Sequence, residues 1–199
     1  MFSTTMTSAA HTQAAPLGAS GRAAPFWAVL ALLLVAGVAR SWVTTSRDGF
    51  TIDEAWHAAA GASYERSGDF RLNPEHPPLV KRWVGLALPP EHFAMPEFRP
   101  MQDKEAERAF INEAVYLMND PDVVQTRVRV AMLALNALLL TGVALSVRRV
   151  FGGTVALGAL GVLVLDPSII AHLPVVLTDL SLALLSAIVF LQATVALRT

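Results

Sequence analysis

The chain has 199 residues, of which 54% are hydrophobic and only 16% are charged, and its formal net charge is −1. Soluble domains carry about 25% charged residues, so this composition predicts an all-α integral membrane protein. The net charge itself says nothing about nucleic acid, but no basic stripe suggests it, so we expect no nucleic-acid partner. The absence of cysteine excludes disulfides and thiolate metal ligands.

The N-terminal part begins with a segment rich in Ser, Thr, Ala and Gly, which we predict to be a flexible cytoplasmic tail over residues 1–24. An apolar run over residues 25–43 follows and is the first predicted membrane span. A signal peptide is the alternative, because Ala36-Gly37-Val38-Ala39 resembles a cleavage site. Trp27 and Trp42 bracket the run like interfacial aromatic residues, which favours an uncleaved anchor.

Three further apolar runs, over residues 128–147, 150–168 and 174–197, bring the prediction to about four transmembrane helices. The third run is short, and Pro167 lies near its end. The basic pair Arg148-Arg149 follows the second run in a very short loop, and such loops stay cytoplasmic. We therefore predict a multi-pass protein of the plasma (inner) membrane, with a cytoplasmic N-terminus and with residues 44–127 on the outer face.

This outer loop is predicted to contain two helices that lie on the membrane surface. The first begins at the capping box Thr51-x-x-Glu54 and ends at Gly68. The second covers residues 103–118, where apolar and charged side chains alternate with a helical period. The proline-rich stretch between them, residues 74–100, is predicted to be irregular.

Acidic residues and histidines gather at the start of the first surface helix. Glu54 has an ordinary role as the capping residue, whereas Asp53 is a candidate for chemistry. Asp53 and His57 are four residues apart and share one helical face. Together with Glu75 or His76 they form a possible site for a divalent metal ion, and the alternative is that His57 is simply an interfacial histidine.

The segment Glu75-His76-Pro77-Pro78 is stiffened by its two prolines, so it can hold Glu75 at a fixed angle or serve as a structural turn. Lys81 and Arg82 follow closely and are candidates to bind a phosphate or anionic lipid headgroups. Asp179 opens the fourth run, where a carboxylate is either functional or a helix cap.

These residues resemble the first outer loop of polyprenyl-phosphate-sugar-dependent glycosyltransferases, a broad class with the GT-C fold. The class contains protein O-mannosyltransferases, lipid A aminoarabinose transferases and related bacterial family 39 enzymes. Phe151-Gly152, Asp166-Pro167 and Thr178-Asp179 resemble later pieces of the same pattern. The resemblance is carried above all by Asp53-Glu54, Gly61, Tyr64, Gly68-Asp69-Phe70, Asn73-Pro74-Glu75-His76-Pro77-Pro78-Leu79 and Lys81.

The resemblance implies that residues 25–199 form the N-terminal part of a GT-C membrane domain. It implies transfer of a sugar from a polyprenyl-phosphate carrier to a lipid, glycan or protein acceptor, with inversion at the anomeric carbon. Asp53 would be the main catalytic residue, with Glu54 beside it and Asp179 as a further acid of the site. The phosphate and substrate would be held by Glu75, His76, Lys81, Arg82 and Arg127, and a metal ion at Asp53, Glu75 and His57 could neutralise the phosphate instead.

Family members have more helices than the four spans predicted here. We therefore expect either the N-terminal catalytic module of a transferase, to which a partner subunit supplies further helices, or a non-catalytic membrane subunit that shares the fold.

Overall fold

The computed structural model describes residues 23–197. Of the predicted tail over residues 1–24, residues 1–22 therefore lie outside the described part of the chain, and residues 23 and 24 belong to the first helix. Most of the described part is helical and none of it is strand, which confirms the predicted all-α class. Its helices in chain order are α1 (Ala23–Thr45), α2 (Ile52–Ser67), α3 (Pro78–Gly85), α4 (Lys104–Asn112), the π-helical turn η1 (Glu113–Leu117), α5 (Pro121–Phe151), α6 (Gly153–Leu165), α7 (Pro167–His172) and α8 (Asp179–Ala196).

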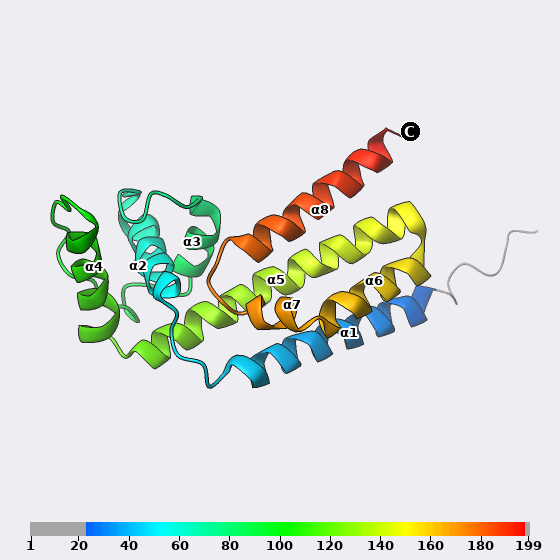
Figure 1. The fold of residues 1–199 in the computed structure, drawn as a ribbon, viewed down its shortest axis with the longest axis horizontal. Coiled ribbons are helices and arrows are strands. Elements are labelled where there is room, and N and C mark those ends of the chain that lie inside the picture. The colour runs from blue at the N-terminus through cyan, green and yellow to red at the C-terminus, as the bar shows by residue number, and fades with distance from the viewer. Residues whose placement is uncertain (1–22, 198–199) are drawn as a thin grey trace, which may run out of the picture.

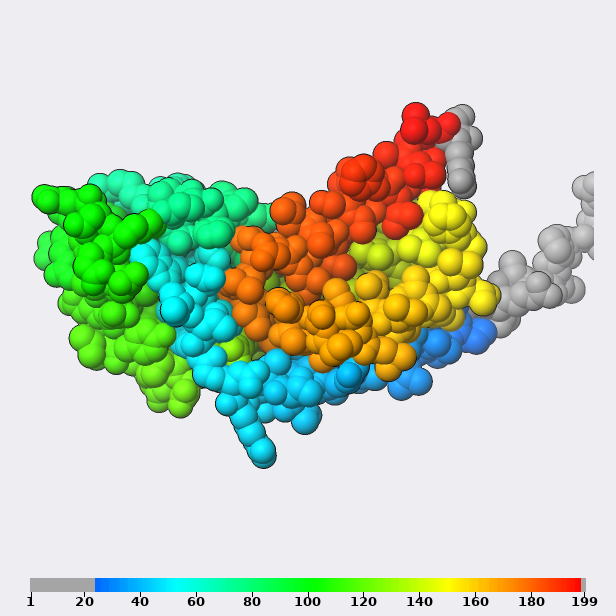
Figure 2. All heavy atoms as spheres, in the orientation of Figure 1, coloured from blue at the N-terminus to red at the C-terminus, as the bar shows by residue number. Residues whose placement is uncertain are grey.

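The helices form two bodies that share α5 (Figure 1). The apolar helices α1, α5, α6 and α8 lie roughly lengthwise along the molecule, while α2, α3 and α4 gather at one end. We call this second body the loop domain and define it as residues 46–120. Figure 2 shows it as one compact mass beside the apolar helices.

Three helices in the described part are long and apolar enough to cross a membrane: Ala24–Thr45, Pro121–Phe151 and Asp179–Ala196. The structure does not show the third predicted span as one helix over residues 150–168, since α6 has only 13 residues. A helix of this length reaches about 20 Å, less than the ~30 Å of a bilayer's hydrocarbon core. The break has a local cause: the Asp166 carboxylate caps α7 by accepting from the Ile169 amide, and Pro167 occupies the first position of that helix.

Arg40 on α1 supplies hydrogen-bond donors to the end of α6. Its guanidinium donates to the carbonyl oxygens of Val164 and Leu165, at 3.1 and 2.9 Å, and so satisfies carbonyls that have no helical partner. The next residue of α1 is Ser41, whose hydroxyl donates to the Ile170 carbonyl of α7 at 2.8 Å. The broken segment α6–α7 is thus held as one unit along α1.

The loop domain is built around α2. The predicted capping box is present, with the Thr51 hydroxyl accepting from the Glu54 amide and the Glu54 carboxylate accepting from the Thr51 amide. The predicted end is also confirmed, because Gly68 adopts a left-handed conformation with φ of 65°. However, α2 does not lie on a surface: residues 57–64 are buried, and its alanines form the centre of the loop domain.

The segment predicted to be irregular, residues 74–100, contains α3. Pro78 occupies the first helical position, where a missing N–H costs nothing. α3 packs closely on α2, because neither Gly61 nor Gly85 has a side chain at the crossing. The predicted helix over residues 103–118 is present as α4 followed by η1.

Candidate functional site

Three segments of the loop domain line an open hollow of about 280 Å³ on its surface. α2 contributes Asp53 near its N-terminus, the loop between α2 and α3 contributes Glu75 and His76, and α4 contributes two cations. The hollow is lined by Ile52, Asp53, Trp56, Asn73, Glu75, His76, Lys104 and Arg108. Of the residues that the sequence suggested as one site, Asp53, Glu75 and His76 therefore line the same hollow and His57 does not, while Lys104 and Arg108 line it without a predicted role.

Asp53 and Glu75 are both exposed carboxylates of this hollow, but Glu75 is held in an ion pair with Lys104. Asp53 lies in the first turn of α2, where the helix dipole favours a negative charge. The ring of Trp56 lies on the same helix and is half-buried, with the Lys104 ammonium 4.9 Å from its centroid. The hollow thus combines a free carboxylate, an aromatic face and cations.

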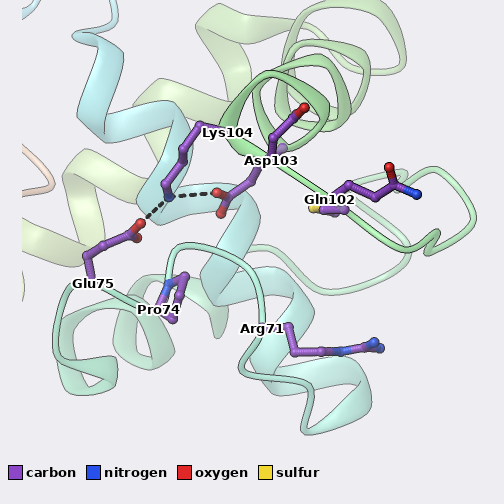
Figure 3. A pocket seen from close by; sticks show the side chains of 8 residues that line it. Arg71, Pro74, Glu75, Gln102, Asp103 and Lys104 are labelled. Atoms are coloured by element: carbon purple, nitrogen blue, oxygen red, sulfur yellow. Dashed lines mark hydrogen bonds and ion pairs between the residues drawn. The ribbon is translucent and has the colours of Figure 1, made fainter.

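Lys104 joins α4 to the loop that carries Glu75. Its ammonium forms an ion pair with Glu75 and a second one, at 2.7 Å, with the buried carboxylate of Glu107 (Figure 3). The hydrogen bond from Lys104 lowers the pKa of Glu75 below its ordinary value. Glu75 and Lys104 also line a second hollow of about 270 Å³, together with Arg71, Pro74, Met101, Gln102, Asp103 and Glu107. This ion pair therefore separates two neighbouring hollows.

Asn73 fixes the start of the loop that carries Glu75 and His76. Its backbone has a positive φ of 50°, a conformation that asparagine tolerates better than most residues. The Asn73 amide donates to the Glu107 carboxylate, and its carbonyl accepts from Lys81 and Tyr64. Polar groups from α2, α3 and α4 thus converge on one loop residue.

Lys81 differs from its predicted role in phosphate binding. Its side chain is fully buried, and the ammonium donates to the Tyr64 hydroxyl at 3.0 Å and to the Asn73 side-chain oxygen at 3.1 Å. Burial lowers the pKa of Lys81 to about 8, and the nearby charges of Glu75 and Glu107 oppose this shift. In this structure Lys81 supports the loop from beneath and does not present its charge to a ligand.

His57 is buried behind the hollow, with its ring 5.0 Å from the ring of His76 in an edge-to-face arrangement. Its Nδ1 atom has no hydrogen-bond partner. Burial, and then the charges of His76 and Lys81, lower the pKa of His57 to about 4, so the ring is neutral near pH 7.

The predicted metal ligands do not fit a metal ion as they stand. Within residues 23–197, no group of three or more His, Asp or Glu side chains is arranged to hold one. Glu75 is paired with Lys104, and His57 lies behind His76. The divalent ion remains a prediction.

Glu54 differs from its predicted catalytic role because its carboxylate is fully buried and fully engaged. Arg129 of α5 donates to both oxygens, at 2.9 and 2.8 Å, and the Val176 amide donates to one of them at 3.3 Å. The other oxygen also closes the capping box with Thr51. Glu54 therefore joins the loop domain to α5 and to the segment before α8.

The remaining predicted residues lie away from the Asp53 hollow. Asp179 is exposed in the first turn of α8 and is not among the residues that line the hollow. Arg82 pairs with Glu65 at 2.7 Å on the outer side of α3. Arg127 is half-buried near the start of α5 and also does not line the hollow.

Sequence reasoning missed four polar residues of this region: Asn73 as a structural centre, and Lys104, Glu107 and Arg108 on α4. The last three were visible only as the polar face of an amphipathic helix. No local signal says what such a face contacts.

Comparison of the chain with protein-family models, with curated proteins and with solved structures finds no match.

Proposed function

We propose that this chain is a membrane glycosyltransferase, or the N-terminal catalytic module of one, that transfers a sugar from a polyprenyl-phosphate carrier to an acceptor. The observation that carries the proposal is the exposed carboxylate of Asp53 in an open hollow that Trp56 and Arg108 also line, in a chain with helices apolar enough to cross a membrane. The sequence resemblance to the GT-C class supports the same assignment.

In the proposed reaction Asp53 acts as the general base. It takes the proton of an acceptor hydroxyl, the acceptor oxygen forms the new bond to the anomeric carbon, and the bond from that carbon to the phosphate oxygen breaks. Attack opposite the leaving phosphate inverts the anomeric configuration. A positioned general base contributes typically 10²- to 10⁴-fold to a rate.

The leaving phosphate requires positive charge, and Arg108 is the best-placed candidate on this side of the molecule. Arg108 lines the hollow, and its ion pair with Glu105, at 3.0 Å, is exposed to solvent on both sides. Exposed pairs of this kind are worth at most about 1 kcal/mol, so a phosphate can replace Glu105 at little cost. Lys104 is less available because two carboxylates hold it.

We also propose that the protein lies in the plasma (inner) membrane with its N-terminus in the cytoplasm and the loop domain outside. The basic pair Arg148-Arg149 between α5 and α6 supports this orientation. The exposed apolar surfaces of α1 and α8 support a partner subunit that supplies further helices, since less than a quarter of either span is buried.

The test is a transfer assay with a polyprenyl-phosphate-linked sugar, in native membranes that contain any partner subunit. We expect Asp53→Asn to lower the transfer rate at least 100-fold without reducing the amount of inserted protein. Asp48→Asn is the matched control, because Asp48 is exposed a few residues before α2 and its hydrogen bonds are made by its backbone. Transfer by Asp53→Asn at the wild-type rate would overturn the assignment of Asp53.

A further inference from the structure

The helix α3 carries an apolar stripe on the face that points away from α2. Leu79, Trp83 and Leu86 follow one another at intervals of four and three residues, so they share one helical face. Leu79 and Leu86 are 65% and 64% exposed, and Trp83 is 37% exposed. The opposite face is different, because Val80 and Val84 are buried in the core of the loop domain.

Trp83 fixes the position of this stripe relative to α5. Its indole N–H donates to the Ala131 carbonyl at 2.7 Å, so the ring lies directly against α5. Val130, the neighbour of Ala131, is 51% exposed, and Leu138 further along α5 is 64% exposed. Exposed apolar side chains are therefore present on α5 as well as on the stripe of α3 that Trp83 attaches to it.

The length of α5 allows an estimate of how deep in the membrane the contact between Trp83 and Ala131 lies. A helix of 31 residues is roughly 46 Å long, whereas the hydrocarbon core is only about 30 Å thick. If Arg148 and Arg149 mark one boundary of the core, the other boundary falls about 20 residues earlier, near Val128. Ala131 then lies roughly one turn inside that boundary, and Trp83 lies at the level where the acyl chains meet the headgroups.

The arrangement of the loop domain agrees with this depth. Figure 1 shows α3 on the side of α2 that faces the apolar helices, while α4 lies on the far side. In Figure 2 the α3 region reaches the molecular surface on the side of α8. Beside the stripe, Arg82 and Glu65 close a shallow hollow whose other lining residues are Leu79, Trp83 and Leu86. An apolar floor with an arginine at its rim suits an acyl chain and its phosphate headgroup.

We propose that α3 is a membrane-contact helix, whose residues Leu79, Trp83 and Leu86 enter the acyl-chain region of the adjacent leaflet and anchor the loop domain there. The inference rests on α5 crossing the membrane, as in the proposed function, and it does not depend on transferase activity. The membrane contact is thus assigned to α3, in a stretch expected to be irregular, and not to α2, which the sequence had suggested as a surface helix.

The natural absence of cysteine allows a direct test with single labelled cysteines. Leu79→Cys and Leu86→Cys, each carrying a nitroxide spin label, are placed in the full chain in phosphatidylcholine–phosphatidylglycerol vesicles. Collision with oxygen, which concentrates in lipid, is compared with collision with a water-soluble nickel chelate. Glu105→Cys is the control for a water-exposed position on α4, and Leu138→Cys is the control for lipid contact on α5.

We expect the labels at positions 79 and 86 to collide several-fold more with oxygen than with nickel, as at position 138 and opposite to position 105. If positions 79 and 86 behave like position 105 while position 138 is in lipid, α3 does not contact the membrane and the proposal falls. Protection from both reagents would show that protein covers the stripe and would overturn it equally. If position 138 is itself in water, the premise that α5 crosses the membrane fails, and the proposal fails with it.

Discussion

Arg129 of α5 holds both carboxylate oxygens of Glu54 of α2, at 2.9 and 2.8 Å, in a pair that is almost completely buried. The same guanidinium donates to the carbonyls of Thr45, Asp48 and Gly49, which form the turn from α1 into α2. Two helices and a turn therefore depend on one cation. The pair lies where the loop domain meets the apolar helices.

Removal of one partner of this pair should destabilise the protein strongly. We expect Glu54→Gln to lower the free energy of unfolding by about 3–5 kcal/mol, because the substitution leaves the Arg129 charge buried without its counterion. The measurement is unfolding of the purified chain in mixed detergent micelles. Glu65→Gln is the control, since its ion pair with Arg82 is exposed and should be worth about 1 kcal/mol or less. Equal losses in the two variants would contradict the structural role of Glu54.

The features that could be predicted from sequence are those with short-range causes. The capping box at Thr51 and Glu54, the left-handed end at Gly68 and the amphipathic α4 each depend on residues within a few positions of one another. The apolar runs of α1, α5 and α8 are likewise readable from composition. The sequence grouped Asp53, His57, Glu75 and His76 by residue type within one outer loop, and all but His57 line one hollow.

The features that could not be predicted depend on distant partners. Nothing near Lys81 in the sequence shows that Tyr64 and Asn73 bury its ammonium, so its charge suggested a phosphate site. Glu54 appeared as a surface cap because Arg129 is 75 residues away. The prolines around α3 suggested irregular backbone, although Pro78 is in fact a favourable helix start. The sequence did suggest Asp166-Pro167 as the stop signal of the third helix, and α6 ends at Leu165, but the contact of Arg40 with the end of α6 depends on a distant residue and could not be predicted.

The network from Glu107 should hold the loop that carries Glu75 and His76. Glu107→Leu removes the acceptor of the Asn73 amide and the second carboxylate of Lys104. A buried donor left without a partner costs about 1–3 kcal/mol, so hydrogen exchange at the Asn73 amide should accelerate roughly 10- to 100-fold. Glu105→Leu is the matched control, because the same change on the same helix removes only an exposed ion pair. Equal exchange rates in the two variants would show that Glu107 does not restrain the loop.

Lys81 should make the stability of the folded protein depend on pH in the alkaline range. The pKa of Lys81 is about 8 in the folded state, below the ordinary value of 10.5, so the unfolded chain binds more protons between these two values. The free energy of unfolding should therefore rise as pH increases from about 8 to 10. Lys81→Met should reduce this rise. Measurements stop at about pH 10, because burial raises the pKa of Tyr64 to about 12 and its effect has the opposite sign at higher pH. An unchanged pH slope in Lys81→Met would contradict the prediction.

The buried His57 should make the folded protein less stable at acidic pH. Its folded-state pKa is about 4 instead of 6.5, so the unfolded chain binds more protons between these values and stability falls as pH decreases through this window. The loss attributable to His57 is at most roughly 3 kcal/mol. His57→Leu should remove most of it, as measured by unfolding at about pH 7 and about pH 4.5. His92→Leu replaces an exposed histidine and should leave the acid sensitivity unchanged. If both variants keep the wild-type sensitivity, the burial of His57 is not its cause.

α2 and α3 should lie too close together to accommodate a side chain at Gly61. A Cβ atom there would overlap the Lys81 carbonyl and lie 3.0 Å from the Gly85 nitrogen, and backbone atoms cannot move aside as a flexible side chain can. Overpacking of this kind typically costs about 1–3 kcal/mol, so Gly61→Ala should destabilise the protein although alanine favours a helix. Since the α2–α3 crossing also positions Lys81 beneath Asn73, the exchange of the Asn73 amide should accelerate in the same variant.

Gly158→Ala separates this steric effect from helix propensity. Gly158 lies inside α6, and a Cβ atom added there would meet no other atom within 4 Å, so alanine should be neutral or should stabilise by roughly 0.4–1 kcal/mol. Thermal unfolding of both variants gives the comparison. A Gly61→Ala protein as stable as Gly158→Ala would mean that α2 and α3 can separate without loss. The position of Glu75 and His76 in the hollow would then not depend on the close packing of α2 against α3.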